Sequence, residues 1–150
     1  MFKVLDKAPD FKLKNQLNED VSLSDFLGKK IVLYFYPKDN TPGCTQQALG
    51  FKEKYNEFIN KNIVIIGISK DSIVSHQKFI EKYDLPFILL SDPDLEVIKM
   101  YNAYGEKKLY GKTSLGVIRT TYLIDEYGFI EQIYQNVKAK ENANEIICSL

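Results

Sequence analysis

Two long apolar runs stand out along the chain because they do not alternate with polar residues. They cover residues 30–36 and 63–69 and are rich in β-branched and aromatic side chains, which is typical of strands covered on both faces of a sheet. From Cys44 to about residue 60, apolar residues recur at the spacing of one helix face, which predicts an amphipathic helix of about four turns. Strand, helix and strand together predict a βαβ unit with a right-handed crossover.

The rest of the chain continues with shorter predicted elements. Helices are expected after a cap at Asp71 or Ser72, from the turn at residues 91–93, and over residues 140–149. Strands are expected at 11–14 paired with 20–23, at 86–90, and at 119–125 paired with 129–137. Residues 24–27 form one expected helical turn, and residues 102–116 fit no element. This order predicts an α/β, thioredoxin-like fold with a mixed central sheet, an N-terminal hairpin and an inserted α-β-α segment.

Length and charge narrow the class of protein. With 150 residues, we expect a single domain over 1–150. Twenty basic residues balance twenty acidic ones, so no summed field favours nucleic acid or a membrane as partner. The apolar runs fall far short of the ~20 residues that span a bilayer, and residues 1–10 lack a secretory apolar stretch, which predicts a cytoplasmic protein. Two cysteines and one histidine are too few for the usual four zinc ligands, so we expect no metal.

The most informative residue is Cys44, which follows a predicted core strand and stands at the head of the long helix. Helix N-termini stabilise anions, and such positions lower the pKa of cysteine thiols from ~8.5 to about 3.5–7.5. A buried core cysteine is the alternative reading. Pro42 and Gly43 weigh against it, because glycine allows close approach to the backbone and a strained strand-to-helix turn is a recurring way to present a nucleophile. A hydroxyl at Thr41 could donate to the thiolate or orient a bound oxygen atom, or it could cap the helix.

The loop and several other segments resemble one enzyme family. Residues 37–45, PKDNTPGCT, resemble the active-site signature of the peroxiredoxins, Pro-x-x-x-Thr-x-x-Cys. More specifically, they resemble the bacterioferritin comigratory protein branch of thioredoxin-dependent thiol peroxidases. Further similar segments follow in the same order: APDF at 8–11, SLSDFLGKK at 22–30, YFY at 34–36, GEKK at 105–108 and RTTYLID at 119–125.

This resemblance implies an activity and a catalytic set. Cys44 would be the peroxidatic cysteine, Thr41 and Arg119 would complete the set, and Pro37 would shield the thiolate from water. Gln47 occupies a position where the family has Glu, Gln or His. Without the motif, Arg119 would be interpreted as a solvent-exposed arginine at the edge of a strand. The branch reduces hydrogen peroxide and organic hydroperoxides with electrons from thioredoxin or another thiol, and no metal, haem or flavin is implied.

Three neighbouring residues are candidates for binding peroxide. The backbone N–H of Gly43 is a plausible extra donor to the substrate. Tyr36 and Pro42 would line the peroxide entrance, although a core tyrosine and a turn proline are equally good interpretations.

The chain departs from the branch at its second thiol. Many members have a resolving cysteine five residues after the first, and here that position is Leu49. The other thiol is Cys148, which a helical projection places away from the apolar face of the last helix. Cys148 could resolve a sulfenic acid within the chain or across a dimer, or take no part. We favour a one-cysteine mechanism with an external thiol, in a monomer or weak homodimer.

Three other functions are less favoured. A dithiol oxidoreductase usually needs Cys-x-x-Cys, but Thr41 occupies that place. A cysteine hydrolase needs a general base, and His76, the sole histidine, is expected to face solvent on its amphipathic helix. A non-catalytic module would leave Cys44 inert, and the pH dependence of its alkylation would reveal this.

Overall fold

The structure is a computed structural model that describes residues 2–150. Met1, the first residue of the expected domain, lies outside the described residues. The central sheet is mixed, as expected. Its strands lie in the order β2 (Asp20–Ser22), β1 (Lys12–Asn15), β5 (Ile88–Ser91), β4 (Ile63–Ser69), β3 (Lys30–Phe35), β8 (Thr120–Ile124) and β9 (Ile130–Gln135). The pairs β3–β4 and β4–β5 are parallel, and the others are antiparallel.

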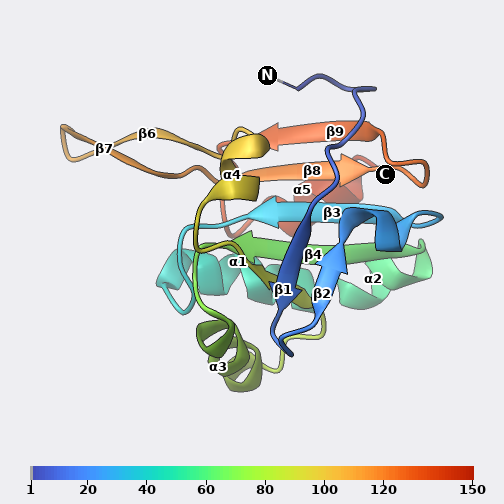
Figure 1. Ribbon diagram of the computed structural model, residues 1–150, viewed down its shortest axis with the longest axis horizontal. Helices are drawn as coiled ribbons and strands as arrows, with labels where there is room; N and C mark the ends of the chain where they lie inside the picture. Colours follow the sequence, from blue (N-terminus) through green and yellow to red (C-terminus); the bar gives the residue numbers. More distant parts are fainter. Residues whose placement is uncertain (1) are drawn as a thin grey trace.

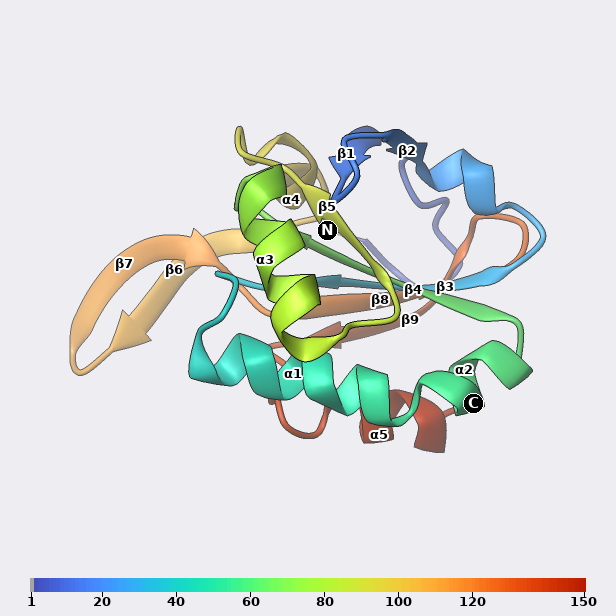
Figure 2. The same cartoon turned by 90° about the horizontal axis from the view of Figure 1, so that it is seen from below.

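Helices cover both faces of this sheet (Figures 1 and 2). One face packs against α1 (Pro42–Glu53), α2 (Tyr55–Asn60), α3 (Ile73–Tyr83) and α5 (Asn142–Cys148). The other face packs against α4 (Glu96–Met100) and the short 3-10 helix η1 (Leu23–Phe26). Within residues 2–150, no helix combines the length and apolar character needed to cross a bilayer.

Strand β3 shows why its sequence is apolar throughout. Successive side chains of a strand point to opposite faces, so Leu33 and Phe35 join the core beneath α4, whereas Val32 and Tyr34 join the core beneath α1. A strand buried on both faces needs no polar positions. The two predicted apolar strands, 30–36 and 63–69, are confirmed as β3 and β4.

The predicted helix from Cys44 to about residue 60 is interrupted. Lys54, with φ −96° and ψ 8°, separates α1 from α2. Phe58 of α2 is fully buried, so the apolar spacing correctly identified a buried face but not the break within it. The hairpin of β8 and β9 and the helix α5 are confirmed, with ends shifted by a few residues.

The segment between residues 91 and 117 differs most from expectation. The helix expected from residues 91–93 begins only at Glu96, because the Asp92 side chain accepts from the backbone N–H of Glu96 and of Ile98 (3.1 and 2.8 Å). Residues 102–116, which fitted no element, contain a long hairpin of β6 (Tyr104–Leu109) and β7 (Lys112–Val117). This hairpin extends away from the body of the protein as an arm (Figures 1 and 2).

The expectation that His76 faces solvent is wrong. Its side chain is fully buried. His76 lies three residues before Phe79 and four before Ile80, so it shares the inward stripe of α3. Both of its ring nitrogens have polar partners, which is the condition under which a buried polar side chain is tolerated.

Candidate active site

Cys44 lies on the first turn of α1, directly after the loop that leaves β3. The helix begins at Pro42, whose fixed φ suits a first helical position, and Thr45 N donates to Thr41 O at 2.9 Å to close the first turn. Cys44 therefore belongs to the first turn, whose N–H groups have no partner within the helix and favour negative charge nearby. Cys44 is only 2% exposed, so bulk water has little access to it.

Arg119 reaches this sulfur from the neighbouring strand. It immediately precedes β8, and the pairing of Thr120 with Phe35 places it beside the end of β3 where the Cys44 loop begins. Its Nη2 donates to Cys44 Sγ at 3.2 Å, and its Nη1 donates to Gln47 Oε1 at 2.8 Å. Residues 75 positions apart are thus joined, and a permanent cation with a planar fork of donors faces the sulfur.

Gln47 is itself held by a further pair of side chains. Its Nε2 donates to Asn142 Oδ1 at 3.0 Å, and the same oxygen accepts from Thr121 Oγ1 at 3.0 Å. Gln47, Thr121 and Asn142 are at most 1% exposed. Asn142 opens α5, so this helix fixes the orientation of Gln47 and, through it, of Arg119.

The glycine before Cys44 leaves room for the guanidinium of Arg119 in its observed position. A Cβ at Gly43 would lie 2.7 Å from Arg119 Nη2, closer than any ordinary contact. Gly43 therefore lets the guanidinium pass over the backbone at the head of α1.

The remaining predicted site residues lie around this centre in different ways. Thr41 is the N-cap residue of α1, and its hydroxyl donates to Lys38 O at 2.9 Å. Pro42 is exposed, and Pro37 is partly buried. Tyr36 is only 1% exposed and donates to Asp39 Oδ1 at 2.6 Å, so a core position describes it better than the rim of an entrance. Burial, and the Asp39 carboxylate beside it, raise the pKa of Tyr36, which keeps its hydroxyl a donor.

A cleft of about 350 Å³ opens beside Arg119, between the β6–β7 arm and the end of β9. Lys107, Lys108 and the acid Glu106 line it from β6, together with Val137. Burial lowers the pKa of Lys107, and the Arg119 guanidinium lowers it further, whereas Cys44 raises it. The cleft therefore brings further positive charge close to the sulfur and its arginine.

Comparison with known proteins agrees with this geometry. Residues 4–133 match the AhpC/TSA family. The chain belongs to this family. It is 52% identical over 143 residues to the Bcp protein of Helicobacter pylori strain J99, covering 95% of this chain and 94% of that one. It is 44% identical over 144 residues to peroxiredoxin Bcp of Bacillus subtilis, covering 96% and 92%.

A solved structure is similar over nearly the whole chain. The bacterioferritin comigratory protein of Xanthomonas campestris, studied for its alkyl peroxide reduction activity, superposes with a TM-score of 0.90 at 32% identity, covering 98% of this chain and 96% of that one. The resemblance found in the sequence and the thioredoxin-like fold are confirmed. The chain is a peroxiredoxin of the Bcp branch, an enzyme that reduces peroxides with electrons from thiols.

The second thiol of this peroxiredoxin lies on another helix. Cys148 is exposed at the end of α5, and Leu49, at the position where many relatives have a resolving cysteine, is partly exposed on α1. Both Cys44 and Cys148 are free thiols. Asn142, at the start of α5, contacts Gln47, and α5 then runs alongside α1 toward α2 (Figure 2). Cys148 is six residues, or about 9 Å, further along the helix.

Sequence reasoning missed three buried polar residues near the site. The helix expected over residues 140–149 gives Asn142 no role of its own, although a buried asparagine on an apolar face needs polar partners. The motif in the loop assigns no role to Asp39, and the expectation for His76 puts it on the exposed face of α3, whereas both residues are buried. The available signal was the spacing of His76, Phe79, Ile80 and Tyr83, which puts a polar side chain in an apolar stripe.

Proposed function

We propose that Cys44 is the peroxidatic nucleophile of this enzyme and that Arg119 orients the reacting atoms. The observation that carries this assignment is the 3.2 Å contact from Arg119 Nη2 to Cys44 Sγ at the head of α1. A guanidinium at this place stabilises a thiolate before reaction and negative charge on the departing oxygen during it.

The chemistry balances without a cofactor. The Cys44 thiolate attacks one oxygen of a hydroperoxide, the O–O bond breaks with its electron pair going to the other oxygen, and that oxygen takes a proton to become water or an alcohol. Cys44 becomes a sulfenic acid. One external thiol attacks the sulfenic sulfur and displaces water, which forms a mixed disulfide with Cys44. A second thiol then attacks the reductant sulfur of that disulfide, so Cys44 leaves as a thiol and the two reductant sulfurs are joined in a disulfide.

Ionisation of the thiol supplies a minor part of the rate. Converting a thiol that is a few per cent ionised into a thiolate raises the rate about thirtyfold, or ~2 kcal/mol. The larger part comes from holding the O–O axis in line with the sulfur and stabilising the leaving oxygen. Gln47 fixes Arg119 for this task through the 2.8 Å contact with Nη1.

The loop residues support the same step. We assign the Thr41 hydroxyl and the Gly43 N–H to the bound peroxide, the shielding of the thiolate from water to Pro37, and the lining of the peroxide entrance to Pro42. Thr41 occupies the N-cap position without a side-chain capping bond, and because its hydroxyl donates to Lys38 O, its oxygen is left to accept from the peroxide. Tyr36 holds the loop through Asp39. The cleft beside Arg119, lined in part by Lys107, has room for an organic hydroperoxide as well as for hydrogen peroxide.

We favour re-reduction by an external thiol, with Cys148 taking no part. The run of α5 toward α2 moves Cys148 away from the head of α1, which supports this choice. Thioredoxin is the proposed donor, in the cytoplasm, where thiols are kept reduced. We further propose that the protein acts as a monomer or weak homodimer.

Intact mass after one equivalent of hydrogen peroxide tests these assignments. We expect wild type and Cys148→Ser to gain one oxygen, and Cys44→Ser to gain none and to stop consuming peroxide. A loss of two hydrogens from wild type would replace the one-cysteine mechanism with an internal disulfide, and a doubled mass would replace it with a bridge between chains. Peroxide consumption by Cys44→Ser at the wild-type rate would refute the nucleophile.

A further inference from the structure

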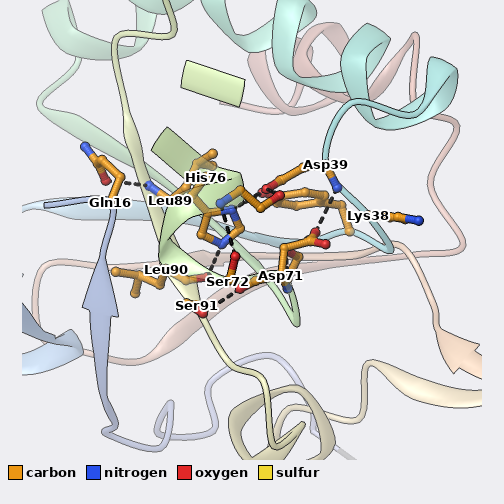
Figure 3. A network of polar contacts seen from close by, with 12 residues as sticks. Gln16, Lys38, Asp39, Asp71, Ser72, His76, Leu89, Leu90 and Ser91 are labelled. Carbon is orange, nitrogen blue, oxygen red and sulfur yellow. Dashed lines mark hydrogen bonds and ion pairs between the residues drawn. The ribbon is translucent and has the colours of Figure 1, made fainter. Parts of the chain in front are cut away.

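A buried acid anchors the loop that carries the active site. Asp39 lies between β3 and α1, five residues before Cys44, and is 7% exposed. Its Oδ1 accepts from Tyr36 OH at 2.6 Å, and its Oδ2 accepts from Ser75 Oγ at 2.8 Å and lies 2.6 Å from His76 Nδ1. Figure 3 shows Asp39 and His76 facing each other, with Asp71 beside the loop.

The other ring nitrogen fixes where the proton of this pair lies. His76 Nε2 is 3.0 Å from Leu90 O, and a carbonyl oxygen only accepts, so Nε2 carries a hydrogen. A second hydrogen lies between His76 Nδ1 and Asp39 Oδ2, because two lone pairs facing each other at 2.6 Å would repel. Because the His76 and Asp39 side chains are 0% and 3% exposed, this short contact is shielded from water and strong. His76 thereby connects the loop to β5.

Neighbouring contacts attach the same stretch of loop to α3 and to the turn before it. Asp39 N donates to Asp71 Oδ2 at 2.8 Å. Asn40 Oδ1 accepts from Lys82 Nζ and from Tyr83 OH at 3.3 and 3.1 Å. These last contacts are exposed and therefore weaker than the buried pair. The contact between His76 and Asp39 is therefore the strongest of those that hold the loop in place.

The catalytic cycle needs this loop to be fixed in one step and released in another. With Cys44 at 2% exposure, a reductant sulfur cannot approach to the ~2 Å of a disulfide bond unless the first turn of α1 and the loop before it move. In the peroxide step, however, the same loop must hold Cys44 against Arg119. Whatever fixes Asp39 therefore acts on the two steps in opposite directions.

We propose that His76 is a positioning residue that, through Asp39, sets the balance between a closed loop that reduces peroxide and an open loop that admits the reductant. This inference rests on the proposed function, in which a Cys44 sulfenic acid reacts with an external thiol. It gives α3 a role in the rate of thiol capture, although α3 contributes no group that touches peroxide.

Paired substitutions of His76 separate the two ring contacts. His76→Gln places an amide near the position of Nε2 and keeps a donor for Leu90 O, but it loses the bond to Asp39. His76→Asn places an amide near Nδ1 and keeps the donor to Asp39. Gln77→Ala is the matched control on α3, because it removes a contact to Gln16 O at 2.7 Å and does not touch the loop.

The rates of the two half-reactions are measured separately, by quenching and intact mass. The first is oxygen gain by the reduced enzyme with hydrogen peroxide, and the second is adduct formation by the oxidised enzyme with 2-mercaptoethanol. We expect His76→Gln to speed the second rate about tenfold and to slow the first severalfold, as loss of a strong buried hydrogen bond would do. His76→Asn is expected to restore both rates toward wild type, and Gln77→Ala to leave their ratio unchanged.

The contrary results are equally distinct. Equal losses in both half-reactions for the Gln and Asn variants, or an unchanged ratio in the Gln variant, would overturn the positioning role. If the His76 variants do not fold, Ser75→Ala, which removes the 2.8 Å contact to Asp39 Oδ2, is expected to shift the ratio about twofold in the same direction, and no shift would overturn the proposal. Wild type that gains no oxygen would instead refute the proposed function itself.

Discussion

Replacing Gly43 with alanine gives a direct test of the arginine contact. The new Cβ would lie 2.7 Å from Arg119 Nη2, the atom that donates to Cys44 Sγ, whereas ordinary contacts begin at 3.4 Å. Nη2 must therefore move by about 0.3 Å to reach 3.0 Å, the shortest contact that a Cβ makes, and by about 0.7 Å to reach an ordinary contact. The φ of Gly43 lies outside the left-handed region, so the backbone itself accepts alanine.

The expected effect is on rate and not on stability. Displacing one donor by up to about 0.7 Å, or losing it, slows comparable reactions by about 10²-fold, or ~2.7 kcal/mol in activation free energy. Alanine has a higher helix propensity than glycine by up to ~1 kcal/mol, so the free energy of unfolding is not expected to fall. A single-site change that lowers activity without lowering stability identifies a geometric requirement.

The assay is the second-order rate of reaction with hydrogen peroxide, measured together with urea unfolding. Gly50→Ala is the matched control, because it makes the same change on the same helix and its Cβ would lie 3.8 Å from Ala143 Cβ, an ordinary contact. We expect this control to react at the wild-type rate. A wild-type rate for Gly43→Ala, or an equal loss in both variants, would refute the argument that Arg119 must pass over the backbone at this point.

Three further predictions follow from the contacts. Arg119→Ala should slow the reaction with peroxide about 10²–10³-fold and change urea stability by less than ~1 kcal/mol; comparable losses in rate and stability would make Arg119 structural. Asn142→Leu leaves the Gln47 amide without its acceptor, so we expect a loss of ~2 kcal/mol in urea unfolding and a peroxide rate about tenfold lower. Burial raises the pKa of Asp10, but hydrogen bonds, chiefly from Ser24 N, outweigh it and lower that pKa below 3.8. The stabilising effect of the ionised Asp10 carboxylate is therefore present above pH 3.8 and lost as the pH falls through the lowered pKa. In thermal unfolding, we expect Asp10→Ala to be less stable than wild type at pH 7 and equally stable near pH 2.

The parts of the fold that follow from local pattern could be predicted. β3 and β4 are buried on both faces, and this burial is what makes their sequences continuously apolar. The position of Cys44 follows from Pro42, because a proline after a loop suits the first turn of a helix. These signals lie within a few residues of the feature they predict.

The β6–β7 arm could not be predicted from such a pattern. Its strands pair with each other outside the central sheet, and Tyr110 and Leu115 are 96% and 66% exposed. A hairpin without a buried face has no reason to alternate apolar and polar residues. The late start of α4 has a related cause, since Asp92 caps the helix from four and six residues away.

The polar contacts of the site depend on residues far apart in the chain, and they divide into two groups. Asn142 and Gln47 hold Arg119 against the sulfur, whereas His76 holds Asp39 and hence the loop. The first group should affect mainly the peroxide step, because Arg119 directly precedes β8 and does not belong to the loop that opens. The second should affect the peroxide and reductant steps in opposite directions. Measuring both half-reactions in one set of variants therefore distinguishes orientation of the reacting atoms from control of loop opening, although both groups are buried and both stabilise the fold.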